Sequence, residues 1–198
     1  MSKTQTIKLP NAWGEYESHD AEFLGRGSFA TCYRIGNRVY SFVKNGDKNN
    51  DYSKEAIAEF ASGLHVPDIR SEGDSQDEKH KIYSMPFYSR LMKESPFAWQ
   101  QAKKLQVIWK RILSSSAWQG SKNTWGYEYN NKIIDAARIE GLPESIIESL
   151  ESIGNACANY GDKYFFEFSN RNLKIDAQGN LIFLDIVFNG QALFDLRK

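Results

Sequence analysis

The apolar pattern of the chain changes near residue 90, and this change limits the folds that are open to it. Before that point, residues 22–44 gather β-branched and aromatic side chains around a Gly-x-Gly and a Gly-Asn turn, which is typical of a twisted hairpin. After it, residues 96–114 carry apolar side chains at a roughly helical period. The sequence therefore predicts an α+β fold, with a β-rich half at residues 1–90 and a helical half at residues 91–198.

Local signals add further elements to each half. We expect a helix over residues 52–64, a short strand after Pro67, and a strand over residues 81–88 that Pro86 ends. In the second half, a helix begins near Pro143 and stops near Gly161. Two closing strands flank a Gly-Asn turn in the sequence "DAQGN".

Composition excludes several classes of protein. Lys plus Arg equals Asp plus Glu at 25 each, so no overall field favours nucleic acid or an acidic membrane surface as the main partner. Cys32 and Cys157 lie far apart, and no histidine pair shows the spacing of zinc ligands. The chain shows neither the apolar core of a signal peptide nor an apolar run of about 20 residues. We expect a cytoplasmic protein with reduced thiols and no membrane partner.

The glycine segment "LGRGSFATCY" suits a loop that approaches phosphate. Gly25 and Gly27 lack side chains, so backbone N–H groups there can reach phosphate oxygens, and Ser28 and Phe29 complete the loop tip. Gly-x-Gly is also common in ordinary hairpins. This segment alone leaves both interpretations open.

A carboxylate, an amide and a second carboxylate follow near the C-terminus. Glu167, Asn172 and Asp185 are separated by five and thirteen positions. The second interval is the one that separates the two magnesium ligands of protein kinases. Upstream, Lys44 ends the second strand of the hairpin, and the helix expected after it contains Glu55 and Glu59.

With these residues the chain resembles a protein kinase, and it is similar to the early serine/threonine protein kinases of T-seven-like coliphages, the autographivirus group. The similarity lies in "LGRGSFATCY", "FVKNG", "FEFSNRN" and "GNLIFLDIVF". It implies a compact protein-kinase-like fold, in which a β-rich N-terminal lobe and a small, truncated helical C-terminal lobe enclose a nucleotide cleft. It also implies Mg-ATP-dependent phosphoryl transfer to a host protein, in the host cytoplasm.

The resemblance further implies a role for each matched position. Four residues of the glycine segment would cover the ATP phosphates, namely Gly25, Gly27, Ser28 and Phe29. Lys44 would contact the α and β phosphates, and Glu59 or Glu55 would hold Lys44 in place. Met85 would lie in the hinge beside adenine. Asn172 and Asp185 would bind Mg²⁺, and Glu167 stands where the family has its catalytic aspartate.

Three departures keep a second function open. Glu167 is one methylene longer than aspartate, and Ser169 stands where many protein kinases have a lysine. Phe42 would crowd the space over adenine if Lys44 faced the cleft. The alternative is a catalytically inactive pseudokinase that inhibits a host enzyme or defence factor through a protein surface. A small α+β inhibitor without any nucleotide is a third interpretation.

The side that Lys44 faces depends on the hairpin turn. A two-residue turn at residues 36–37 puts Ser41 on the face of Cys32 and turns Lys44 away. A three-residue loop with a bulge instead brings Phe42 and Lys44 to that face. Counting without gaps from the glycines favours the second register.

Two polar or aromatic segments are expected to be irregular. The run at residues 71–81 is predicted to be a solvated loop. The segment at residues 118–132 predicts either a partner-binding surface or packing beneath a loop, because it is rich in aromatic residues, namely Trp118, Trp125, Tyr127 and Tyr129.

Overall fold

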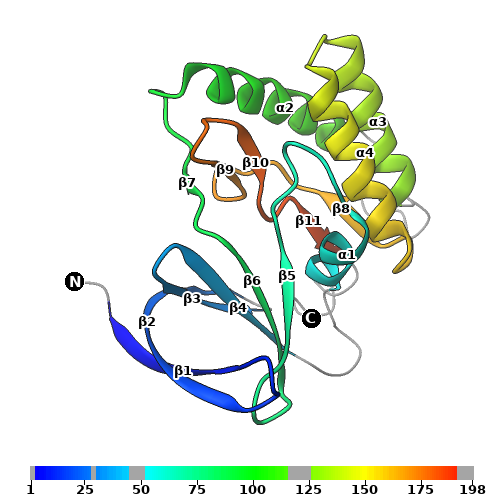
Figure 1. Ribbon diagram of the computed structural model, residues 1–198. Coiled ribbons are helices and arrows are strands. Elements are labelled where there is room, and N and C mark those ends of the chain that lie inside the picture. The colour runs from blue at the N-terminus through cyan, green and yellow to red at the C-terminus, as the bar shows by residue number, and fades with distance from the viewer. Residues whose placement is uncertain (1–2, 28–29, 45–51, 116–125, 191–198) are drawn as a thin grey trace.

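A computed structural model describes residues 3–27, 30–44, 52–115 and 126–190. The expected loop-tip residues Ser28 and Phe29, and the aromatic residues Trp118 and Trp125, lie outside these ranges. The protein has the α+β class predicted from its sequence, with a curled antiparallel sheet in the N-terminal part and four helices in the described ranges (Figure 1). Within the same ranges, no helix combines the length and the apolar character needed to cross a bilayer.

The larger sheet is antiparallel, and its strands follow the order β1-β2-β3-β4-β6-β5. Their bounds are Thr4–Pro10 for β1, Tyr16–Arg26 for β2, Ala30–Ile35 for β3, Arg38–Lys44 for β4, Arg70–Asp74 for β5 and His80–Pro86 for β6. The sheet curls so that β1 and β2 bend over one of its faces (Figure 1).

One strand of this sheet, β1, was not expected from the sequence, whereas β5 lies where a short strand was expected after Pro67. β1 pairs with β2 along its whole length, from Thr4 opposite Glu22 to Pro10 opposite Tyr16. β5 occupies residues 70–74, so the prediction of a solvated loop over residues 71–81 is wrong for its first part. The side chains of β5, which is an edge strand, are mostly exposed, and its sequence therefore has the polar composition of a loop.

The turn between β3 and β4 has two residues, and the expected three-residue loop with a bulge is wrong. Ile35 pairs with Arg38 and Cys32 pairs with Ser41, without a register shift. Gly36 has a φ of 57°, the left-handed conformation that a tight hairpin turn needs. A slip of one residue reverses the face of every side chain in a strand. Lys44 consequently lies on the opposite face from Ser41.

The two faces of the sheet pack against different groups. One face, which includes Val43, Tyr83 and Met85, joins the main core together with the helices and the short strands. The other face packs beneath the curled strands β1 and β2 in a small cluster of Ile7, Leu9, Ala21 and Ile82. Each face of β4 and β6 therefore has its own environment.

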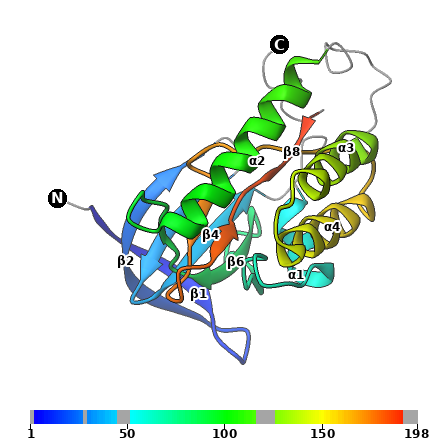
Figure 2. The ribbon, with the colours of Figure 1, turned by 90° about the horizontal axis from the view of Figure 1, so that it is seen from above.

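The helices are α1 (Ser53–Phe60), α2 (Pro96–Ser114), α3 (Gly126–Ile139) and α4 (Glu144–Ala158). The predictions of α2 and α4 are confirmed, whereas α1 is shorter than expected. The prediction of an irregular segment at residues 118–132 is wrong from Gly126 onward, where α3 begins. On that helix Tyr129 is buried and Tyr127 is 50% exposed. Helices α3 and α4 lie side by side, and α1 contacts α4 (Figure 2).

Short strands lie between the helices and the larger sheet (Figure 1). Their bounds are Tyr164–Phe166 for β8, Leu173–Ile175 for β9, Leu181–Phe183 for β10, Val187–Asn189 for β11 and Ser89–Arg90 for β7. β9 pairs with β10 and β7, and β8 pairs with β11. The expected turn between β9 and β10 is confirmed, with Gly179 at a φ of 85°.

Candidate functional site

Two backbone hydrogen bonds join the loops that contain Glu167, Asn172 and Asp185. The amide of Glu167 donates to the carbonyl of Ile186 at 2.6 Å, and the amide of Leu184 donates to the carbonyl of Asn172 at 3.0 Å. These bonds reach the residues on either side of Asp185. The structure therefore brings the three predicted residues into one place, although they are far apart along the chain.

Buried aromatic rings pack directly beneath these loops. Phe166 and Phe168, on either side of Glu167, are fully buried, as is Phe183 two residues before Asp185. The rings of Phe168 and Phe183 meet edge to face at 6.1 Å between centroids. Alternation along the chain then turns Glu167 outward, so the core fixes the carboxylate at the edge of the packed region.

A lysine that the sequence did not single out contacts Asp185. Nζ of Lys54, in the first turn of α1, lies 3.1 Å from Oδ1 of Asp185. The Asp185 side chain is 54% exposed, whereas that of Lys54 is 15% exposed. The carboxylate is thus open to solvent on one side and held by a cation on the other.

The Asn172 side chain has a free acceptor. Asn172 is buried, and its Nδ2 donates to the carbonyl of Glu167 at 3.5 Å. No residue in the described ranges donates to its Oδ1. Among the described residues, the Glu167 side chain has one neighbour of opposite charge, Arg171, at 3.4 Å between Nη2 and Oε1.

Asp185 and Asn172 suit magnesium better than zinc. The described ranges contain no group of three or more His, Cys, Asp or Glu residues that could hold a metal ion. Mg²⁺ needs only one or two protein carboxylates, because phosphate oxygens and water complete its octahedron. One carboxylate and one amide oxygen therefore fit Mg²⁺ bound together with a phosphate, and Lys54 would share the carboxylate with it.

The glycines of the first hairpin have no packing reason to be glycine. Gly25 pairs with Cys32 at a bulge, and a Cβ added at Gly25 would meet no atom of a described residue within 4 Å. Among the described residues, a Cβ at Gly27 would meet only the carbonyl oxygen of Ala30, at 3.8 Å. Neither has a left-handed φ. The backbone is therefore open to a ligand on the face that Cys32 shares with Ser41.

The corrected register changes the positions of two predicted residues. Lys44 is exposed and lies on the face opposite Ser41, and it makes no ion pair with any described residue. Phe42 shares that opposite face, where its ring contacts Tyr33. The condition under which Phe42 was expected to crowd adenine, Lys44 on the face of Cys32, is therefore not met, and the small Ser41 lies on that face.

The expected partners of Lys44 bind other groups. Glu55 accepts from Nζ of Lys81 at 2.7 Å and from the hydroxyl of Tyr83 at 3.3 Å. The hydrogen bond to Glu55 raises the pKa of Lys81, and burial together with the Glu55 charge raises the pKa of Tyr83. Glu59 instead accepts from the hydroxyl of Tyr160 at 2.9 Å. α1 is therefore fixed to the sheet through Glu55.

Met85 lies where the chain leaves the larger sheet. It is buried opposite Val39, and one residue later β6 ends at Pro86. The amide of Phe87 still donates to the carbonyl of Asn37, at 2.8 Å, before the chain enters β7. The segment expected as a hinge is thus the connection between two sheets.

The loop after Glu167 is also fixed by α2. Nε2 of Gln106 donates to Oδ1 of Asn170 at 2.7 Å, and Gln106 is itself buried. Oγ of Ser169 is buried and has no hydrogen-bond partner among the described residues. The neutral hydroxyl of Ser169 brings no positive charge to the position where many protein kinases have a lysine.

No protein-family model matches the chain, and no curated protein matches it. The similarity to phage kinases thus remains a prediction from the four sequence blocks, and the function must be argued from the geometry of the site.

Proposed function

We propose that this protein is a phage-type serine/threonine protein kinase that transfers a phosphoryl group from Mg-ATP to a host protein. The observation that supports this most directly is the pair of backbone hydrogen bonds that join the Glu167 and Asn172 loop to the residues beside Asp185. An acid, an amide and a second acid are thereby held beside a largely buried lysine, Lys54. This set matches the base, metal ligands and cation that phosphoryl transfer needs.

In this proposal Asp185 and Asn172 hold Mg²⁺, which supplies positive charge at the phosphates when it is bound. Lys54, rather than Lys44, is the lysine that contacts the phosphates, because it already lies on the metal-binding carboxylate. Gly25 and Gly27 cover the phosphates with open backbone.

Glu167 takes the proton from the substrate hydroxyl. Its carboxylate is partly exposed, and its only ion pair in the described ranges is with the exposed Arg171 at 3.4 Å. A serine or threonine hydroxyl can therefore approach it from solvent. A general base of this kind contributes about 10²- to 10⁴-fold to the rate.

A pseudokinase is the second candidate, and specific observations favour it. Ser169 provides no positive charge, and Lys44 lies on the face away from the glycine backbone. Lys54 also occupies one oxygen of the carboxylate that Mg²⁺ would need. In that case the protein would act by binding a host enzyme or defence factor.

One experiment separates these functions. The purified protein is incubated with labelled ATP, with and without magnesium, and nucleotide binding and label transfer to host lysate proteins are measured on the same sample. Asp185→Asn, which keeps the size of the side chain, is the matched control. Binding with transfer that Asp185→Asn abolishes supports the kinase. Binding without transfer supports the pseudokinase, and the absence of binding contradicts both.

A further inference from the structure

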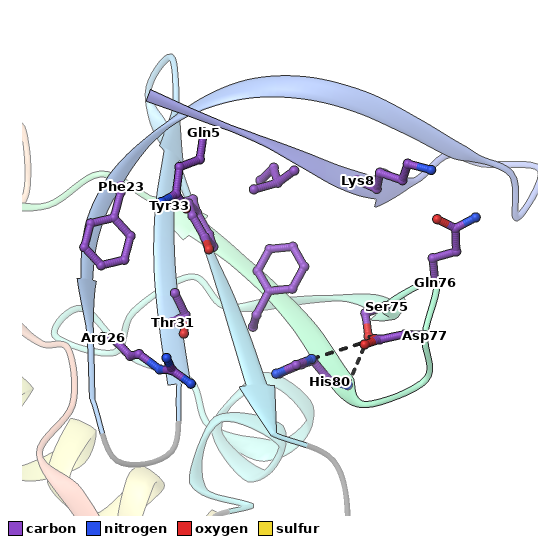
Figure 3. Close-up of a pocket in the computed structure, with 12 residues that line it drawn as sticks. Gln5, Lys8, Phe23, Arg26, Thr31, Tyr33, Ser75, Gln76, Asp77 and His80 are labelled. Carbon is purple, nitrogen blue, oxygen red and sulfur yellow. Dashed lines mark hydrogen bonds and ion pairs between the residues drawn. The ribbon is translucent and has the colours of Figure 1, made fainter. Parts of the chain in front are cut away.

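A large groove lies on the face of the sheet that does not include Ser41. Its volume is about 760 Å³, and β1 and β2 curl over it (Figure 3). The alternation along β3 and β4 that places Ser41 and Cys32 on one face places Tyr33 and Phe42 in this groove. The groove is therefore separate from the site proposed for ATP.

Four rings form a row along the groove floor. The centroids of Phe23 and Tyr33 are 5.9 Å apart, those of Tyr33 and Phe42 are 5.6 Å apart, and those of Phe42 and His80 are 6.3 Å apart. Each pair meets edge to face, at 65°, 85° and 70°. All four side chains are only half-buried, so the row is accessible to flat ligands.

The side chains that line the groove have a net positive charge. Lys8 and Arg26 line opposite ends of it, both are exposed, and neither makes an ion pair within the described ranges (Figure 3). Asp77, the acid in the lining, accepts from Oγ of Ser75 at 2.6 Å, lies 3.9 Å from Nδ1 of His80 and keeps its negative charge. Two cations against this one carboxylate leave the lining with a net positive charge. The groove therefore favours an anion although the whole chain has no net charge.

We propose that this groove binds a short segment of single-stranded nucleic acid. Bases would stack on the rings of Phe23, Tyr33 and Phe42, while phosphates would contact Lys8 and Arg26. Aromatic platforms combined with cations that follow the backbone are the usual means of binding single strands without sequence preference. The lining amides Gln5 and Gln76 can donate and accept hydrogen bonds at base edges. A duplex is excluded by its stacked bases, which cannot reach the rings.

The probes are fluorescein-labelled oligo-dT and oligo-U of about ten nucleotides, long enough to cover a site of the usual size. Their anisotropy is titrated with the full chain in EDTA at about 50 mM salt, where phosphate contacts are strongest. EDTA removes magnesium, so the proposed ATP site does not contribute. The expected dissociation constant is about 1 to 100 µM, and affinity falls as salt is raised.

Two kinds of variant test the location. Lys8→Gln combined with Arg26→Gln should weaken binding and flatten the salt dependence by about 1.4 in log–log slope, because two phosphate contacts are lost. Lys110→Gln combined with Lys132→Gln removes two exposed lysines from helices α2 and α3 and should leave binding unchanged. Tyr33→Leu should weaken binding about tenfold through lost stacking.

Several outcomes would overturn the proposal. They are the absence of binding at low salt, equal binding by the Lys8 and Arg26 variant, and competition by poly-glutamate as effective as that by unlabelled oligonucleotide. The last outcome would mean that the groove attracts any polyanion, including an acidic protein segment. The charge variants affect exposed side chains, so they remain informative if Tyr33→Leu fails to fold.

Discussion

Nζ of Lys54 lies 3.1 Å from Oδ1 of Asp185, and this contact joins helix α1 to the loop before β11. The next residue, Glu55, bonds to Lys81 and Tyr83 in the larger sheet. Two consecutive residues of α1 thus connect the glycine-containing sheet to the loop of the predicted metal ligands. The position of α1 therefore sets the distance between the two halves of the proposed ATP site.

Lys54→Met should weaken Mg-ATP binding by about ten- to a hundredfold, because a hydrogen bond to a charged group contributes about 1.5–3 kcal/mol. Lys44→Met is the matched control and should leave affinity unchanged, since Lys44 lies on the other face of the sheet. Isothermal titration calorimetry measures both. The reverse result, with Lys44 essential and Lys54 dispensable, would restore the assignment made from the sequence.

Magnesium dependence tests the two predicted metal ligands. Mg-ATP should raise the melting temperature, because a ligand that binds only the folded state stabilises it by about 2.7 kcal/mol at a hundredfold excess over its dissociation constant. Asp185→Ala should abolish the part of the shift that needs magnesium, and Asn172→Ala should reduce it. Differential scanning fluorimetry with and without EDTA measures this. An unchanged melting temperature at millimolar Mg-ATP in the unmodified protein contradicts nucleotide binding.

The sequence predicted elements whose pattern is local. The helical period of α2, the proline before α4 and the turn at Gly179 are each set by neighbouring residues, and all three are confirmed. The interval of thirteen residues between Asn172 and Asp185 is likewise visible in the sequence, and in the structure a backbone hydrogen bond from Leu184 to Asn172 connects the two loops.

Elements that depend on distant residues were missed. β1 buries only Ile7 and Leu9, so its sequence shows little apolar alternation. Helix α3 includes the buried Asn130, whose side chain bonds to the backbone of Tyr164 and Phe166. A buried amide of this kind makes a helix look polar in sequence.

The prediction of the sheet face on which Lys44 lies was wrong for a different reason. One residue in the length of a turn decides the face of every following side chain. The residue types around residues 36–37 allowed both registers. The contact between Lys54 and Asp185 could not be predicted either, because it depends on how α1 packs against the loop before β11. The spacing of residues along the chain does not indicate this packing.

A buried histidine makes stability depend on pH. Nδ1 of His65 donates to the carbonyl of Leu181 at 2.6 Å, so Nε2 is the acceptor for the hydroxyl of Ser145 at 3.0 Å. Burial lowers the pKa of His65 below 6.5. The unfolded chain therefore takes up a proton first as pH falls, and the free energy of unfolding should decrease below about pH 6.5 by at most about 1.4 kcal/mol per pH unit.

His65→Gln tests this, because the glutamine amide can still donate to a carbonyl but does not titrate. Urea unfolding from about pH 7.5 to about pH 5, the range in which histidine changes its charge, gives the slope of stability against pH. The slope should be smaller in the variant than in the unmodified protein. Equal slopes would show that His65 is not responsible.

Glu167→Gln should lower phosphoryl transfer by a factor of about 10² to 10⁴ while Mg-ATP affinity changes little, because the amide cannot accept the hydroxyl proton. The fold should tolerate the change. The backbone amide of Glu167 keeps its bond to the carbonyl of Ile186, and among the described residues the side chain loses only its ion pair with Arg171. Transfer of label from ATP and nucleotide binding are measured on the same preparations.

Glu128→Gln, an exposed glutamate on α3, is the control and should leave transfer unchanged. Glu167→Asp keeps the carboxylate and should retain part of the activity. If Glu167→Gln leaves the effect on the host intact, the base is unnecessary and the pseudokinase gains support. Substitution of the half-exposed Tyr127, or of Trp125 or Trp118, which precede it by two and nine residues, should then abolish that effect, because aromatic side chains dominate protein-binding surfaces.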